Sequence, residues 1–357
     1  MFKWMLVFVP AAIVLELLAA ERHLLVFVAA ALAIIPLASW LSRATEQLAE
    51  RCGEGVGGLL NATFGNATEL IIAISAMRAG LHDVVKASLA GSIVGNILLV
   101  LGAAMLAGGL NHREQLFNAS AARAQASLLM LAAIALILPA AYNAVIAPRV
   151  PHGLQALSLY ISLVLLLVYG LFLVYSLATH KNLFAGDPDA MKKTLQAPAW
   201  STGKALVVLA AATAMIAWVS EILVAAVEPS ARQLGLSNLF VGVFIVAILG
   251  NAAEHASAIS AAMNNRMDLS LAIAIGSSVQ VALFVAPVLV LISYFITAIP
   301  MDLAFSSGLV LSMLLAILIT GQVAGDGRSD WLKGVQLLAV YLILGLAYFF
   351  TPDSAVS

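Results

Sequence analysis

Apolar runs of about 20 residues alternate with short polar stretches along the whole 357-residue chain. About 20 apolar residues in a helix cross a hydrocarbon core roughly 30 Å thick, and a helix satisfies its own backbone hydrogen bonds in lipid. The pattern therefore predicts an all-α membrane protein with eleven transmembrane helices. The expected spans are residues 4–20, 23–42, 56–77, 84–109, 121–147, 154–178, 205–227, 239–263, 269–297, 303–323 and 331–350.

The first span is short enough to resemble a signal peptide. No clear small-x-small cleavage site precedes another domain, so it is interpreted as a leading transmembrane helix. The longest polar stretch between spans lies near the middle of the chain, and residues 181–204 are interpreted as a linker.

Composition supports a membrane location and excludes several other classes. The chain is 63% hydrophobic and only 10% charged, whereas soluble domains are about a quarter charged. A net charge of −1 leaves no basic surface of the kind that nucleic acid needs. Cys52 is the only cysteine, so an intrachain disulfide and a thiolate metal cluster are both excluded.

The distribution of Lys and Arg predicts the orientation. With eleven spans, five of the seventeen basic residues fall on one side and the other twelve on the side of the N-terminus. The five are Arg22, Arg78, Lys86, Arg149 and Arg232. Because cytoplasmic segments carry the excess of Lys and Arg, we expect the N-terminus and the linker in the cytoplasm and the C-terminus outside.

The chain contains an internal repeat. The stretch GNATELIIAISA at 65–76 resembles GNAAEHASAISA at 250–261, and the offset of 185 also relates Gly91 to Gly276 and Ser92 to Ser277. Upstream, TEQL at 45–48 resembles SEIL at 220–223. The predicted organisation is a leading helix at 1–22, a five-helix repeat at 23–180, the linker at 181–204 and a second repeat at 205–357. Five is odd, so the second copy must be inverted, and inverted repeats with a glycine-interrupted polar helix indicate a secondary transporter.

Each copy of the repeat places a carboxamide and a carboxylate on one helix face. Asn66 and Glu69 are three residues apart, as are Asn251 and Glu254, and the glycine before each Asn can loosen the helix and free carbonyl oxygens. These hard oxygen ligands suit Ca²⁺. The alternative is that the amides bond neighbouring helices and each Glu is a protonated packing residue. Two symmetry-related carboxylates in the membrane favour a functional site, because such groups are costly there.

A pair of facing carboxylates also predicts a mechanism. Both cannot stay ionised without a partner in a low dielectric, so the favourable states are two protonated groups, or two ionised groups around one Ca²⁺. The empty, doubly charged state should not cross, which makes exchange obligatory. With two protons per Ca²⁺, each pH unit sustains about a hundredfold Ca²⁺ gradient. Ca²⁺ and H⁺ are then transported ions, and no cofactor is expected.

The paired GNATE and GNAAEH stretches, with GSIVGNILLVLG at 91–102 and GSSVQVAL at 276–283, resemble the alpha repeats of the cation/proton exchanger branch of the Ca²⁺/cation antiporter superfamily. The resemblance covers nearly the whole chain. It implies that Glu69 and Glu254 are the transport carboxylates and that Asn66, Asn251 and Gln280 line the site or ligate the ion. It also implies a multi-pass protein, which we expect in a prokaryotic plasma membrane.

The identity of the counter-ion is inferred from the differences between this chain and the Na⁺-coupled members of that superfamily. Na⁺/Ca²⁺ exchangers carry a Ser/Thr-rich, Pro-containing stretch before each Glu and a further acidic residue in the later helix. Here Asn replaces the hydroxyl pattern, no Pro precedes either Glu, and the later helix offers Gln280. The sequence therefore favours H⁺, with a Na⁺-coupled exchanger as the alternative.

Further polar residues are weaker candidates. Ser92, Ser277, Ser278 and Asn96 are candidates for lining the ion pathway, with close helix packing as the alternative for the serines. His255 directly follows Glu254, so it faces elsewhere on the helix, and it either relays protons or makes an interhelical hydrogen bond.

Two carboxylates outside the repeat core are candidates for gating or ion access. Glu46 and Glu221 occupy the shared TEQL and SEIL stretches and should lie at opposite membrane faces if the repeat is inverted, with solvated helix ends as the alternative. Asn61 and Asn66 match the glycan acceptor pattern. That interpretation is rejected, because Asn66 should lie inside the bilayer with Asn61 nearby.

Two other classes of function remain as alternatives. A cation channel would also place polar groups at the bilayer midplane, but would more often assemble identical subunits than use an internal inverted repeat. An intramembrane hydrolase would need a catalytic pair or a metal motif, and the chain has no His-Glu-x-x-His. The sequence leaves open the proton stoichiometry, the selectivity among Ca²⁺, Mn²⁺ and Cd²⁺, and whether the chain forms a homo-oligomer.

Overall fold

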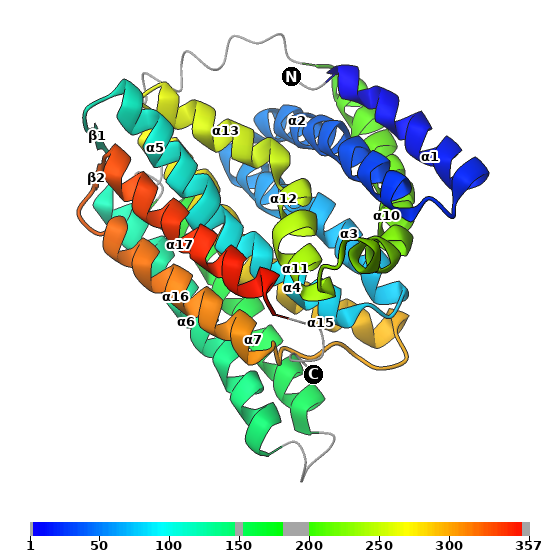
Figure 1. Cartoon of the computed structure of the whole chain (residues 1–357). Coiled ribbons are helices and arrows are strands. Elements are labelled where there is room, and N and C mark those ends of the chain that lie inside the picture. The colour runs from blue at the N-terminus through cyan, green and yellow to red at the C-terminus, as the bar shows by residue number, and fades with distance from the viewer. Residues whose placement is uncertain (1–2, 147–152, 181–199, 352–357) are drawn as a thin grey trace.

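The computed structural model describes residues 3–146, 153–180 and 200–351. Most of the predicted linker, residues 181–199, lies outside the described residues. The first half of the chain forms η1 (Lys3–Val7), α1 (Phe8–Ala19), α2 (His23–Phe64), α3 (Ala67–Arg78), α4 (His82–Val94), η2 (Gly95–Val100), α5 (Leu101–Asn111), α6 (Ala119–Val145), α7 (Gly153–Val174) and η3 (Tyr175–Thr179). Figure 1 shows these helices and those of the second half as one bundle.

The second half repeats the same kind of order. It forms α10 (Thr202–Leu234), α11 (Asn238–Phe240), η4 (Val241–Val246), α12 (Ala247–Gly250), α13 (Ala252–Met263), α14 (Met267–Gln280), η5 (Val281–Val285), α15 (Ala286–Ile296), α16 (Ser307–Val323) and α17 (Trp331–Phe349). The π-helical turns η2 and η5 lie at nearly equivalent places in the two copies, inside the long helices α4–α5 and α14–α15. Such turns are frequent at functional sites.

The helical membrane architecture agrees with the prediction, whereas the count of eleven spans is not confirmed. Within the described residues, seven helices are long and apolar enough to cross a membrane, or eight if a bent pair counts as one span. That pair, Asn238–Gly250 and Ala252–Met263, bends by 65°. The segments Trp4–Ala19 and Ser307–Val323 are apolar but shorter.

Helix α2 differs from the predicted spans 23–42 and 56–77, because it is helical through the polar stretch between them. A Cβ atom on Gly57 would lie 2.2 Å from the carbonyl oxygen of Ala49. Eight residues rise about 12 Å in a straight helix, so the backbone folds back between these two positions. The candidate span accordingly ends at Cys52. Helix α2 therefore consists of two segments. The first of them ends about ten residues later than the predicted span 23–42.

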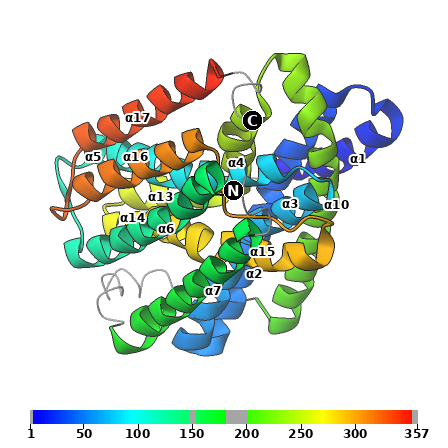
Figure 2. The same ribbon diagram turned by 90° about the horizontal axis from the view of Figure 1, so that it is seen from below.

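Two apolar cores divide the bundle. The first joins α1, α2 and α10 through side chains such as Ile34, Leu41, Ile216 and Leu223, and these helices lie together in Figures 1 and 2. The second joins α4 to α7 with α14 to α17. Helix α3 contributes to both, with Ile72 in the first core and Met77 in the second.

Trp200 fastens the start of α10 to α2. Its backbone N–H donates to Gln47 Oε1 at 2.7 Å, and its carbonyl accepts from Arg51. The cations of Arg43 and Lys204 lie 5.4 Å and 4.9 Å from the centre of its ring. Residues near position 47 of α2 therefore lie beside the first turn of α10.

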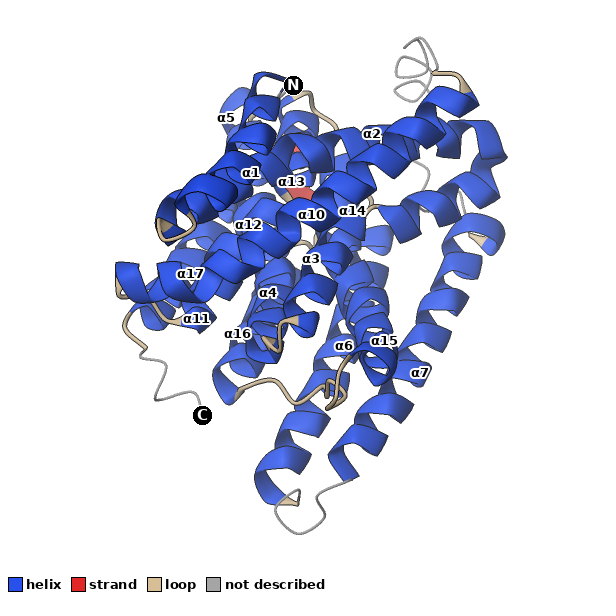
Figure 3. Cartoon of the chain, turned by 90° about the vertical axis from the view of Figure 1, so that its right-hand side faces the viewer, coloured by secondary structure: helices blue, strands red, loops and turns tan. Residues whose placement is uncertain are grey.

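Two short strands depart from the all-helical expectation. Strands β1 (Gln115–Leu116) and β2 (Arg328–Ser329) pair antiparallel, with Gln115 opposite Ser329; they are the small red segment in Figure 3. Arg328 also contacts Glu114 at 3.1 Å. The strands tie the loop after α5 to the loop after α16, and strands of two residues carry too little pattern to be predicted from sequence.

Candidate cation-binding site

Both copies of the repeat interrupt a helix at the predicted place. Asn66 precedes α3 with φ −98° and ψ 22°, and Asn251 precedes α13 with φ −99° and ψ 5°. Neither Asn side chain caps its helix, so both amides are available for other contacts. Glu69 and Glu254 lie in the first turn after these breaks.

Each glutamate packs against the glycine of the other repeat. A Cβ atom on Gly250 would lie 3.4 Å from Glu69 Oε1, and one on Gly65 would lie 3.7 Å from Glu254 Oε1. These are van der Waals distances, so each carboxyl group lies against the backbone of the opposite break. The two half-sites therefore meet at one place, and each helix break accommodates the acid of its counterpart.

Three buried oxygens at this place have no hydrogen-bond partner in the described part of the chain: Glu69 Oε2, Glu254 Oε2 and Asn251 Oδ1. Unpaired buried acceptors are costly, and a proton or a cation would satisfy them. All three are hard oxygen ligands and they come from both repeats. No group of three or more His, Cys, Asp or Glu side chains that could hold a metal occurs among the described residues, so the site has two acids and otherwise neutral ligands.

The serines of the repeat bond the asparagines of the opposite copy. The Ser277 hydroxyl donates to Asn66 Oδ1 at 3.2 Å. The Asn251 amide donates to Ser92 Oγ and to the Ala247 carbonyl, each at 3.1 Å. Helices α4 and α14 thus pair symmetry-related serines with the asparagines, although the serine donates in one half-site and accepts in the other.

Asn96, Gln280 and His255 join this network from positions that the repeat does not share. The Asn96 amide donates to Ser277 Oγ at 3.2 Å, and the Asn66 amide donates to Gln280 Oε1. The His255 ring nitrogen Nε2 lies 3.1 Å from Asn96 Oδ1. The interhelical hydrogen bond expected as one reading of His255 is therefore present.

Ser278 is separate from this network. Its hydroxyl donates to the carbonyls of Ile93 and Ala274 at 3.3 Å and 3.1 Å, and the side chain is fully buried. These contacts fit the helix-packing alternative.

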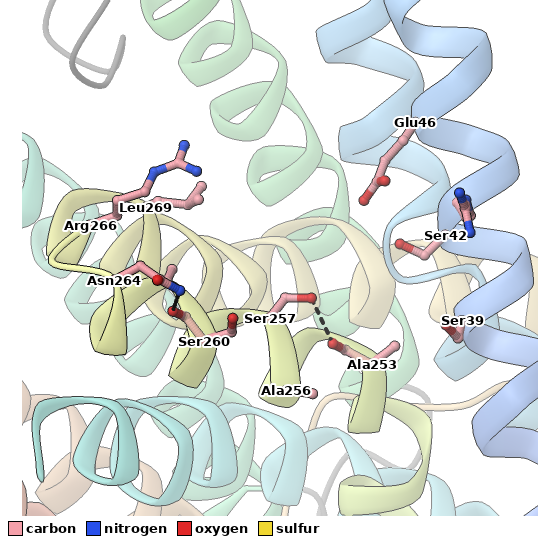
Figure 4. Close-up of a pocket in the computed structure, with 12 residues that line it drawn as sticks. Ser39, Ser42, Glu46, Ala253, Ala256, Ser257, Ser260, Asn264, Arg266 and Leu269 are labelled. Carbon is pink, nitrogen blue, oxygen red and sulfur yellow. Dashed lines mark hydrogen bonds between the residues drawn. The ribbon is translucent and has the colours of Figure 1, made fainter. Parts of the chain in front are cut away.

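A cavity of about 490 Å³ approaches the site from one side. Figure 4 shows Ser42 and Glu46 of α2 across the cavity from Ser257 and Ser260 of α13. The lining includes Ala253 but neither glutamate of the site. These lining serines were not predicted. Ser39 and Ser42 of α2 are three residues apart, as are Ser257 and Ser260 of α13, so each pair shares one helix face.

Glu46 and Glu221 are well separated along the α2–α10 pair. Glu46 is next to Gln47, which contacts Trp200 just before α10 begins. Glu221 lies nineteen residues after Thr202 in the same continuous helix, or about 28 Å along an axis that rises 1.5 Å per residue. Glu46 lines the cavity, whereas Glu221 is exposed and lies 3.7 Å from Arg78.

Comparison with known proteins gives one consistent result. A family model described as sodium/calcium exchanger protein matches residues 22–178 and 204–350. A Ca²⁺/H⁺ antiporter of Aphanothece halophytica is 45% identical over 341 residues, covering 92% of this chain and 90% of the relative. The Ca²⁺/H⁺ antiporter ChaA of Bacillus subtilis is 41% identical over 347 residues, covering 96% and 98%. The structure of native YfkE superposes with a TM-score of 0.83 at 39% identity, covering 98% of this chain and all of that one.

Proposed function

The chain belongs to the sodium/calcium exchanger protein family, and we propose that it is a secondary active antiporter that exchanges Ca²⁺ for H⁺ across a membrane. Relatives that are more than 40% identical over nearly their whole length are named Ca²⁺/H⁺ antiporters. The observation that carries the proposal is the meeting of two carboxyl groups, one from each repeat, whose buried Oε2 atoms have no hydrogen-bond partner among the described residues.

Ca²⁺ and protons would use the same two side chains in turn. With Ca²⁺ bound, Glu69 and Glu254 are ionised ligands, and Asn251 Oδ1 is already unpaired and available. With protons bound, both carboxyl groups are neutral. Each loaded state has no net charge at the site, whereas the unloaded pair carries two negative charges in a medium that solvates them poorly. Return without an ion is therefore suppressed, and the two fluxes are coupled.

Access would alternate by movement of one core against the other. Helices α2 and α10 share the first apolar core with α1, and they carry Glu46 and Glu221 at well-separated positions. Rocking of this body would open the cavity beside Glu46 or a path beside Glu221, around a site that stays in place. The cavity at Glu46 supports assignment of the present state as open on that side.

We propose the orientation in the membrane from the distribution of Lys and Arg along the chain. Arg43 and Arg266 line the cavity, and both belong to the twelve basic residues on the predicted cytoplasmic side. We therefore assign the open side to the cytoplasm of a prokaryotic cell. The inverted repeats at 23–180 and 205–357 are supported by the two separate stretches that the family model matches.

Flux of ⁴⁵Ca²⁺ into inverted membrane vesicles tests the function. We expect uptake when the lumen is acidic, collapse of uptake when a protonophore removes the pH gradient, and no effect of Na⁺. Dependence on a Na⁺ gradient would instead support the Na⁺-coupled exchanger. Uptake that needs no opposing gradient would indicate a channel. Vesicles carrying the double variant Glu69→Gln, Glu254→Gln serve as the control for leakage.

A further inference from the structure

The two repeats differ at several positions close to the site, and three of these differences are linked to one another. In each pair one copy carries a hydrogen-bonding side chain and the other does not. The pairs are Asn96 and Val281, Gln280 and Gly95, and His255 and Leu70, each related by the offset of 185. The structure brings these three polar members into one continuous chain of hydrogen bonds.

This chain has one direction. Because the Asn96 amide nitrogen donates to Ser277, its oxygen faces His255, and the ring nitrogen Nε2 of His255 must carry the hydrogen. Ser277 accepts from Asn96 and donates to Asn66. The Asn66 amide in turn donates to Gln280. Every donor along the chain points from His255 toward the ion site.

The direction of the chain makes the half-sites unequal. Asn66 Oδ1 and Gln280 Oε1 both accept hydrogen bonds, whereas Asn251 Oδ1 is buried and unpaired. We infer that the chain masks the oxygen ligands of the Asn66 half-site, and that His255, acting through Asn96, is a positioning residue that keeps Ca²⁺ binding weak enough for release. This inference rests on the proposed function and deepens it.

The physical reason is that a masked oxygen must break a hydrogen bond before it can ligate an ion. Without the His255 donor, Asn96 is free to turn its amide and accept the Ser277 hydroxyl. The hydroxyl then no longer points at Asn66 Oδ1, which becomes available to Ca²⁺. One net hydrogen bond of about 1 kcal/mol corresponds to a roughly fivefold change in Kd, and tighter binding in turn slows release.

The test compares variants that borrow the residue of the other repeat. His255→Leu removes the donor by installing the residue found at position 70, and Asn96→Val installs the one found at position 281. His255→Gln keeps an N–H donor. His112→Leu is the matched control, because His112 also bonds α13, at the Met263 carbonyl (3.1 Å), but outside the chain. Equilibrium Ca²⁺ binding to the purified full-length protein and ⁴⁵Ca²⁺ flux are measured at one fixed pH.

We expect His255→Leu to lower the Kd for Ca²⁺ about fivefold and to slow turnover by a similar factor. Asn96→Val, alone or combined with His255→Leu, should keep the wild-type Kd, because it removes the acceptor to which the Ser277 hydroxyl would turn. His255→Gln should restore the wild-type Kd, and His112→Leu should keep it. A general loosening of the structure would raise the Kd instead. An unchanged or higher Kd in a folded His255→Leu protein, or a double variant that binds Ca²⁺ as tightly as His255→Leu, overturns the inference while leaving the antiporter proposal intact. Failure of the wild-type protein to bind Ca²⁺ overturns both.

Discussion

Replacing Glu254 by Gln should halve the number of protons that a bound Ca²⁺ displaces. In the wild-type site both carboxyl groups must lose a proton before Ca²⁺ binds. Among the described residues no cluster of three or more His, Cys, Asp or Glu side chains could hold the ion instead. The slope of log Kd against pH should then approach −2 where both are protonated. Each unit of acidification raises the Kd about a hundredfold, or about 2.7 kcal/mol. In Glu254→Gln only Glu69 remains to be deprotonated. The slope should therefore be no steeper than −1, which is about a tenfold change in Kd per pH unit.

The assay is equilibrium Ca²⁺ binding to detergent-solubilised protein over a pH series. Isothermal titration in two buffers of different ionisation enthalpy counts the released protons independently. Glu114→Gln is the matched control, since Glu114 is an exposed glutamate that pairs with Arg328 at the surface, and its slope should match the wild type. The two steps of the wild-type curve belong to the pair, because coupled groups titrate together.

Two outcomes would refute this reasoning. A wild-type Kd that does not change with pH, over the range where transport does, would mean that protons act elsewhere than at the Ca²⁺ site. A slope near −2 in Glu254→Gln would mean that a group other than Glu254 supplies the second proton. Either result would end the model in which both ions share two carboxylates.

Three further predictions follow from the same structure. Glu69→Gln or Glu254→Gln should abolish ⁴⁵Ca²⁺/H⁺ exchange in vesicles while gel filtration still shows folded protein, and near wild-type flux from either would contradict the two-carboxylate mechanism. Gln280→Ala should weaken Ca²⁺ transport without eliminating it, since an amide contributes a dipole and no charge; complete loss would make Gln280 an indispensable ligand. Asp326→Asn should lower stability by less than about 1 kcal/mol in thermal unfolding, because the partner Lys333 holds the pKa of this exposed carboxyl below its usual value. That contribution is present above the ordinary Asp pKa and disappears as the pH falls through the lowered one, so the variant and the wild type should converge in acid.

The features set by the bilayer were predictable from the sequence. Apolar length fixes where helices run, and the glycine and Asn before each Glu fix where they break. Both interruptions were predicted, and the structure places them at Asn66 and Asn251. The path of α2 between Ala49 and Gly57 was not predictable, because helix-forming polar residues continue the helix past the apolar run. The exact number of spans depends on how such bent and short segments are counted.

The candidate site could be predicted only as far as the repeat is symmetric. Residues present in both copies, such as Ser92 and Ser277, could be paired across a pseudo-twofold axis before any coordinates were known. The link between His255 and Asn96 has no counterpart in the other copy, so symmetry could not supply its partner. Trp200 was also missed, since its role depends on Arg43 and Gln47, which are far from it in sequence.

Two ion pairs, Lys86–Asp302 and Arg78–Glu221, differ in exposure in a way that fits the proposed rocking motion. Lys86 and Asp302 are 2.7 Å apart, with side chains only 12% and 22% exposed, and Lys86 also donates to the Ala304 carbonyl. The neighbours of both residues in the chain belong to the second core, so this buried pair lies within one body.

The pair between Arg78 and Glu221 is instead 65% and 63% exposed, and Glu221 lies on α10 in the first core. An exposed pair contributes about 0–1 kcal/mol, which thermal motion can break in every cycle, whereas removing one partner of a buried pair costs several kcal/mol. Met77, next to Arg78, belongs to the second core. The weak contact therefore crosses between the two cores that the proposed motion would separate, and the strong one joins residues within a single core.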